Sequence, residues 1–234
     1  MRATSRETGS ISGDEFPGSA TVRSRRPAAR FAGSPMAQAA VRFARARHAG
    51  QYREIDHAAF IAHPIEVGSL LRRDGQPDEV IAAGLLHDAL EKTATTSAEL
   101  HGRFGAQIAQ LVESVSDDPS IGAYKPRKRE LCDRIARADP GARAVFAADK
   151  IAKVRELAML PARQLSKPKN RAKLAHYRAS LETLRQVDGD RPLVARLDAE
   201  LNQLLAWAAS TTHRAGPIVS AAGSKPSQHR TLAV

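Results

Sequence analysis

The sequence has one cysteine, few aromatic residues and no long apolar run, and each shortage excludes a class of protein. A single cysteine, Cys132, cannot form a disulfide within the chain, which predicts a reducing, cytoplasmic location. No run of about 18 apolar residues occurs, so no transmembrane helix is expected. The first thirty residues hold arginines but no apolar stretch, so no secretory signal is predicted. Aromatics are only 4% of the residues, so alanine and leucine should fill the core, as in closely packed helices.

The basic charge is concentrated at the two ends of the chain. The formal net charge is +11, but residues 1–34 carry six arginines against three acids, and residues 212–234 carry three basic residues and no acid. The remaining body has a mild positive excess, which suits a small anionic ligand as well as it suits a nucleic acid. Nucleic-acid binding through the tails is therefore ranked last among the functions considered.

The order of segments predicts one all-α domain between two tails. Residues 1–34 and 212–234 are rich in small, polar and basic residues without periodicity, and both are predicted to be disordered. Residues 35–211 are predicted to form a single helical bundle, because helix periodicity recurs there and no strand pattern or repeat is found. The main helices are expected near residues 35–49, 61–73, 77–92, 127–138, 142–160, 168–187 and 191–209.

Three short segments, far apart in the sequence, carry candidate metal ligands. They are His63 in AHPIEV, His87 and Asp88 in LLHDALEKT, and Asp149 in FAADKIAKV. Two imidazoles and two carboxylates suit a divalent first-row ion such as Mn(II) or Fe(II). A bound ion of this kind acidifies water and neutralises phosphate charge, which phosphoester hydrolysis requires. Any one of these segments alone would more often have a structural role than bind a metal. However, an apolar run precedes His87 and Asp88, so these polar side chains should be buried and should need partners.

Longer stretches around these residues resemble a known family. The stretches are FARARHAGQYREIDHAAFIAHPIEVGSLL, AAGLLHDALEKT, AELHGRFGAQIAQLVESVS and AADKIAKVREL. In this order they resemble the HD superfamily of metal-dependent phosphohydrolases, and within it the hydrolase domain of Rel/SpoT-type alarmone enzymes and the stand-alone small alarmone hydrolases. The resemblance covers about residues 36–160 and weakens towards residue 184.

The resemblance implies an all-α HD domain that removes the 3′-pyrophosphate from ppGpp or pppGpp with Mn(II). By the same resemblance, Glu91 corresponds to the carboxylate that positions or activates the attacking water, Arg53 to a residue packing on the guanine base, and Tyr177 to an aromatic near the nucleotide. Core packing is an equal alternative for Tyr177. The implied metal ligands are His63, His87, Asp88 and Asp149.

Two lysines depart from the family pattern. Lys92 stands where the family has a second acid after Glu91, and Lys153 stands where it has asparagine. We expect Lys153, with Lys150, to hold phosphate oxygens and steady the developing charge. The alternatives are a simple helix ion pair between Lys153 and Asp149, and a solvated Lys92 at a helix end.

Three functions follow, in order. The first is a (p)ppGpp 3′-pyrophosphohydrolase, expected to act only in the direction of hydrolysis because too few residues follow Leu160 for a nucleotide-transfer domain. The second is an HD phosphohydrolase acting on another nucleotide or phosphate ester. The third is a sensor that binds a nucleotide but has lost turnover through Lys92. The sequence leaves the oligomeric state open.

Overall fold

The computed structural model describes residues 31–214, so most of both predicted tails lies outside the described residues. Every regular element in the described part is a helix, and Tyr52 and Ala59 add an isolated β-bridge. The all-α prediction is confirmed. The helices are α1 (Pro35–Arg47), α2 (Ala62–Arg73), α3 (Asp78–Leu86), α4 (Ala89–Lys92), α5 (Ser97–Phe104), α6 (Ala106–Val115), α7 (Tyr124–Ala136), α8 (Pro140–Ala158), α9 (Ala162–Leu165), α10 (Pro168–Asp188) and α11 (Pro192–Arg214).

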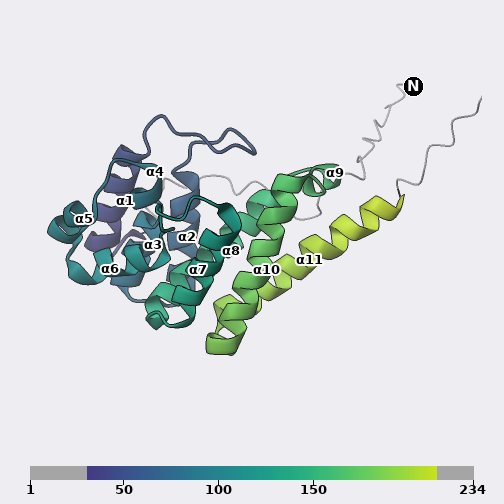
Figure 1. Ribbon diagram of the computed structural model, residues 1–234. Helices are drawn as coiled ribbons and strands as arrows, with labels where there is room; N and C mark the ends of the chain where they lie inside the picture. The colour runs from purple at the N-terminus through teal and green to yellow at the C-terminus, as the bar shows by residue number, and fades with distance from the viewer. Residues whose placement is uncertain (1–30, 215–234) are drawn as a thin grey trace, which may run out of the picture.

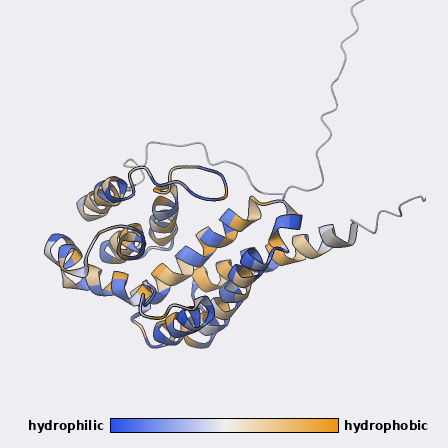
Figure 2. Cartoon of the chain, turned by 45° about the horizontal axis from the view of Figure 1, so that its top comes forward, coloured by the Kyte–Doolittle hydropathy of each residue, from blue (hydrophilic) through white to orange (hydrophobic). Residues whose placement is uncertain are grey.

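Helices α3 and α8 lie at the centre of the bundle. Helix α3 packs against α1, α2, α6 and α8, and α8 also packs against α10 and α11. Figure 1 shows α1 to α6 gathered at one end, α10 and α11 at the other, and α8 between them. The chain from Val80 to Leu86 is buried without a break, as expected for a helix that is apolar on all sides. The outer helices carry both hydrophobic and hydrophilic residues (Figure 2).

The predicted long helix over residues 77–92 is wrong in one respect, because it breaks at His87 and Asp88. Helix α3 ends at Leu86, and the short helix α4 starts at Ala89. The Nδ1 atom of His87 lies 2.8 Å from the carbonyl oxygen of Gly84. In an unbroken helix that carbonyl would accept from the backbone N–H of Asp88, so the histidine side chain competes with the helical ladder. The break leaves His87 and Asp88 at the junction of the two helices, where Nε2 of His87 lies 3.5 Å from Oδ1 of Asp149 on α8.

The packed structure also includes residues that the sequence analysis placed elsewhere or missed. Phe31, which falls within the predicted N-terminal tail, is fully buried against the core. The single turn α9 was not predicted. Within residues 31–214, no helix combines the length and the apolar character that crossing a bilayer requires.

Charged side chains fasten α8 to its neighbours on both sides. The guanidinium of Arg155 on α8 lies 2.9 Å from Glu66 on α2 and 2.5 Å from Glu200 on α11. A single side chain thus connects three helices. Helix α8 also carries one of the predicted ligands, Asp149.

Helices α2 and α3 approach closely because each has a glycine at the contact. A Cβ on Gly84 would lie 2.2 Å from Cδ1 of Leu71, and one on Gly68 would lie 2.7 Å from Cδ2 of Leu85. Both leucines are buried and have little room to move.

We therefore predict that Gly84→Ala lowers the free energy of unfolding by about 1–3 kcal/mol, through overpacking. Gly102→Ala is the matched control, because nothing lies within 4 Å of its added Cβ. Alanine there should be neutral or stabilise by up to about 1 kcal/mol. Urea unfolding followed by circular dichroism measures both variants, and equal stability of the two would contradict the packing argument.

Candidate metal centre

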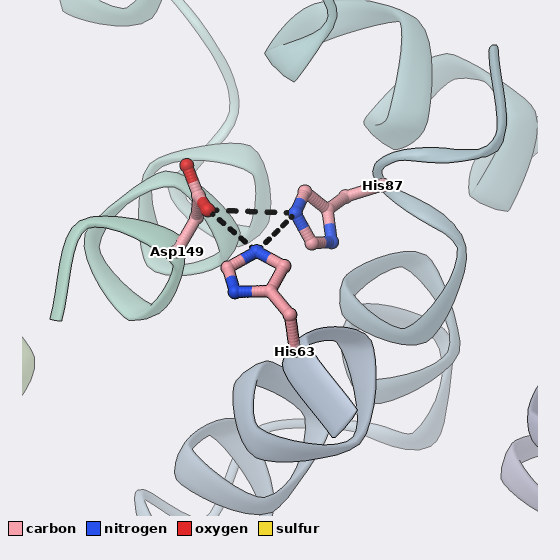
Figure 3. Close-up of side chains that lie close together, drawn as sticks. All are labelled: His63, His87 and Asp149. Atoms are coloured by element: carbon pink, nitrogen blue, oxygen red, sulfur yellow. Dashed lines mark hydrogen bonds and ion pairs between the residues drawn. The ribbon is translucent and has the colours of Figure 1, made fainter. Parts of the chain in front are cut away.

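Four predicted ligands meet where α2, the α3–α4 junction and α8 come together. His63 lies in the first turn of α2, His87 and Asp88 form the junction, and Asp149 lies in the middle of α8. All four side chains are buried, and His63 is 0% exposed. Figure 3 shows the two imidazoles and the carboxylate of Asp149 pointing at one another from three different elements.

The ligand atoms are close enough to share one ion. Nε2 of His63 lies 3.2 Å from Nε2 of His87 and 3.0 Å from Oδ1 of Asp149. Oδ2 of Asp88 lies 3.6 Å from Nε2 of His63 and 3.4 Å from Nε2 of His87. The ligand atoms of His63, His87 and Asp149 all lie within 4.8 Å of one another, and Asp88 lies beside the two imidazoles. Two nitrogens and two oxygens are a donor set that suits a divalent first-row metal.

The hydrogen bonds around this point fit a metal. Nδ1 of His87 is held by the carbonyl of Gly84, which leaves its Nε2 lone pair free to face the centre. Oδ2 of Asp88 is buried and has no hydrogen-bond partner in the described structure. A buried carboxylate oxygen without a partner is costly, and a cation at the centre would satisfy it.

Electrostatics hold both carboxylates in their ionised form. Burial raises the pKa of Asp88, but the charges of His87, Lys153 and Lys92 outweigh it and leave the pKa below its ordinary value. The pKa of Asp149 is likewise well below its ordinary value, because Lys150 and the two imidazoles overcome the effect of burial. Ionised carboxylates are the form that binds metal.

Three lysines surround the carboxylates. Nζ of Lys150 lies 2.6 Å from Oδ2 of Asp149 and 4.1 Å from the centre of the Phe146 ring. Nζ of Lys92 lies 3.6 Å from Oδ1 of Asp88. Lys153 is largely buried; burial lowers its pKa, but the charges of Asp88 and Asp149 prevail and raise it. Asp149 therefore forms its ion pair with Lys150, and Lys153 attracts the same carboxylate at longer range.

A cavity of about 670 Å³ opens above the ligands. This volume is in the range of pockets that hold small organic ligands. His87, Asp88 and Asp149 line its floor, whereas His63 lies beneath it. The walls combine positive charge with aromatic rings, and they include Arg53, Lys92, Lys128, Lys150, Lys153, Lys173, Tyr52, Phe60, Tyr124, His176 and Tyr177.

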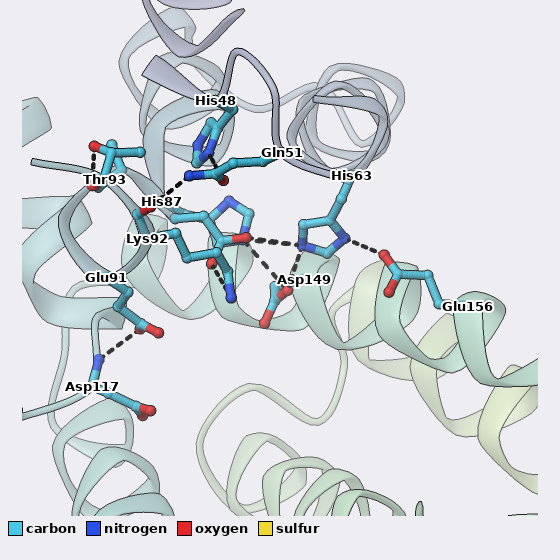
Figure 4. Close-up of polar contacts among 12 residues, drawn as sticks. His48, Gln51, His63, His87, Glu91, Lys92, Thr93, Asp117, Asp149 and Glu156 are labelled. Carbon is cyan, nitrogen blue, oxygen red and sulfur yellow. Dashed lines mark hydrogen bonds and ion pairs between the residues drawn. The ribbon is translucent and has the colours of Figure 1, made fainter. Parts of the chain in front are cut away.

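The other predicted site residues also line this cavity. Glu91 is exposed, and one of its oxygens accepts a 2.7 Å hydrogen bond from the backbone N–H of Asp117, so its carboxylate is turned towards that loop (Figure 4). Arg53 lies in the segment between α1 and α2 and is paired with Asp56. Tyr177 on α10 is buried and belongs both to the hydrophobic core and to the cavity wall.

Sequence analysis missed two buried groups at the cavity. Oε1 of Glu156 lies 2.8 Å from Nδ1 of His63, on the side of the ring away from the ligands (Figure 4). His176 lines the wall, where burial, with Lys150 and Lys128, lowers its pKa to about 2. The only sequence signal for Glu156 is its position seven residues, or two helical turns, after Asp149. Many residues share such a spacing, so it does not single out Glu156.

We predict that a divalent metal stabilises the folded protein through these ligands. At a free-metal concentration of 100 times the dissociation constant, binding adds about 2.7 kcal/mol and raises the melting temperature. The double variant His87→Ala/Asp88→Ala should show no metal-dependent shift in differential scanning calorimetry. A shift of equal size in this variant would place the metal elsewhere.

Comparison with known proteins agrees with this geometry. A family model described as an HD domain matches residues 40–171. The mouse guanosine-3′,5′-bis(diphosphate) 3′-pyrophosphohydrolase MESH1 is 37% identical over 118 residues, which cover 49% of this chain and 65% of the relative. The guanosine-3′,5′-bis(diphosphate) 3′-pyrophosphohydrolase of Aquifex aeolicus is 41% identical over 93 residues, which cover 40% of this chain and 13% of the relative. The aligned part thus spans just under two thirds of the mouse relative.

Solved structures show the same fold. A metazoan ortholog of SpoT that hydrolyzes ppGpp superposes with a TM-score of 0.64 at 24% identity, covering 73% of this chain and 96% of that one. A protein from Listeria monocytogenes superposes with a TM-score of 0.54 at 24% identity, covering 62% of this chain and 99% of that one. The family match covers more than half of the chain and includes all four converging side chains, and the chain belongs to the HD domain family.

Proposed function

We propose that the protein is a metal-dependent phosphohydrolase that removes the 3′-pyrophosphate from ppGpp or pppGpp. The observation that carries the proposal is the convergence of His63, His87 and Asp149, with Asp88 beside both imidazoles, at the base of a cavity whose walls carry cationic and aromatic side chains. Relatives named for this reaction are 37% identical over 118 residues, and the HD family match spans these four residues. In ppGpp the phosphate groups would contact the cationic side chains of the wall, and the guanine base would contact the aromatic ones.

We take Mn(II) to be the metal, with Fe(II) as an alternative. Two imidazoles and two carboxylates leave coordination positions open on either ion. When bound, such an ion supplies an acidified water and neutralises phosphate charge. His63, His87, Asp88 and Asp149 would hold it. The ligand atoms of His63, His87 and Asp149 lie within 4.8 Å of one another, Asp88 lies beside both imidazoles, and the two carboxylates are ionised.

Glu91 is the proposed group that orients or deprotonates the attacking water. Its carboxylate lies on the cavity wall and is steadied by the backbone N–H of Asp117. A carboxylate held by one oxygen keeps the second free to accept a proton. Since Lys92 occupies the position of a second acid, Glu91 carries this role alone.

Lysines and aromatic residues are proposed to bind the nucleotide. Lys153 lies among the carboxylates of the centre and is well placed to meet a phosphate once a metal neutralises them. Lys150 is already paired with Asp149, so we expect it to act on the phosphate mainly through the field it adds. Arg53 and Tyr177 offer a guanidinium plane and a ring to the base.

We predict that metal-stripped protein resupplied with Mn(II) releases GDP and pyrophosphate from ppGpp. The release should require Mn(II) and vanish in the His87→Ala/Asp88→Ala variant, because both ligands are lost. Anion-exchange chromatography of the products measures this. If Mn(II) binds but ppGpp is untouched while another nucleotide is turned over, the substrate is that nucleotide and the phosphohydrolase function stands.

A second candidate function is a sensor that binds ppGpp without turnover. The observation that favours it is the ammonium of Lys92, which lies 3.6 Å from the ligand Asp88 at the position of a second acid. If the protein is a sensor, the wild type binds ppGpp but releases no GDP, because Lys92 replaces one carboxylate of the water-activating pair.

For the sensor we predict that Lys92→Asp starts hydrolysis and that Lys92→Gln does not. The aspartate supplies a second carboxylate, whereas the glutamine removes the charge without adding a base, so the pair separates the two effects. General-base catalysis typically contributes a factor of about 10²–10⁴. GDP release already present in the wild type would rule out the sensor.

A further inference from the structure

Glu156 contacts two parts of the site at once. It lies on α8, two turns after Asp149, and its side chain is 12% exposed. Its Oε1 lies 2.8 Å from Nδ1 of His63 and 3.8 Å from Nη1 of Arg53. Figure 4 shows Glu156 on the far side of the His63 ring from Asp149. The carboxylate therefore stands behind one metal ligand and beside a residue proposed to bind the base.

The chemistry of a ligating imidazole requires a group in this position. An imidazole that binds a cation through Nε2 carries its proton on Nδ1, and that N–H needs an acceptor. His63 is 0% exposed, so solvent does not supply one. Nδ1 of His63 and Oε1 of Glu156 are both buried, and neither has a hydrogen-bond partner in the described structure, although they approach each other to 2.8 Å. The two atoms that lack partners face each other.

We propose that Glu156 is a positioning residue that fixes the ring and tautomer of His63 for metal binding and ties the Arg53 segment to the metal centre. The proposal rests on the metal centre of the proposed function. Carboxylates behind ligating histidines keep the ring oriented and make the imidazole a better ligand, and their loss commonly weakens metal affinity 10–100-fold. Loss of the Arg53 contact should also raise KM for the nucleotide.

A purely structural role is the rival explanation, because Glu156 also connects α8 to α2. The chain offers a matched control for it. Glu66 on α2 contacts Arg155 on α8 at 2.9 Å, so it joins the same two helices without touching a ligand. A general loosening of the α2–α8 contact would affect both glutamates alike.

The experiment measures Mn(II) affinity of the full chain without nucleotide, by competition with a chelator of known affinity. We expect Glu156→Ala to weaken Mn(II) binding about 10–100-fold, and Glu156→Gln to weaken it far less because the amide oxygen still accepts from Nδ1. Glu66→Ala should leave the affinity unchanged. Thermal unfolding of the metal-free variants shows that each is folded.

Different outcomes overturn different claims. If wild type binds Mn(II) and Glu156→Ala binds it equally well, or if Glu66→Ala loses as much affinity, the positioning role of Glu156 is wrong and the proposed function is untouched. If wild type binds no Mn(II), the metal centre falls and this role falls with it. If Mn(II) binds but ppGpp is not hydrolysed, the affinity ratio still decides the role of Glu156, because no substrate enters the measurement.

Discussion

The close contact between α2 and α3 is the constraint on which the site depends. Gly68 and Gly84 let the two helices approach, so that His63 at the start of one reaches His87 at the end of the other. Helix α8 then packs across both and brings Asp149 to the same point. Nothing in the site requires a long or flexible connection. Ligands separated by many residues meet because three rigid, buried helices cross.

Burying two carboxylates at that crossing requires compensating charge. In the metal-free protein the compensation comes from Lys92 and Lys150, which contact Asp88 and Asp149, and from Lys153, whose charge acts on both. Removing a carboxylate from such a cluster would leave an unpaired buried cation, which is costly. These two carboxylates and three lysines sum to about one positive charge without an ion, and a divalent ion raises that to about three. An anionic ligand suits the second state better than the first.

Much of the fold and the ligand set could be predicted from sequence, for identifiable reasons. Ser34 and Thr96 accept hydrogen bonds from the backbone N–H groups three residues later, as serine and threonine commonly do at the start of a helix. The four candidate ligands could be picked out from the sequence because their motifs are unusual, and the fold brings their side chains together. The break at His87 was not predicted, because the apolar pattern runs through it and only a side-chain contact with Gly84 interrupts the helix. Glu156 has no motif of its own; its partner lies 93 positions earlier in the sequence, and only the packing of α8 on α2 brings the two together.

The origin of the cavity walls has a consequence for how specificity can change. The match to the HD family ends at residue 171, yet α10 supplies Lys173, His176 and Tyr177 to the cavity beyond that point. The four converging ligands all lie before it. Substitutions on one face of α10 can therefore reshape the cavity without replacing any of the four converging side chains. This part of the cavity wall can therefore vary independently of the four converging side chains, whereas the rest of the wall, including Arg53 and Lys153, lies in the same stretch as they do.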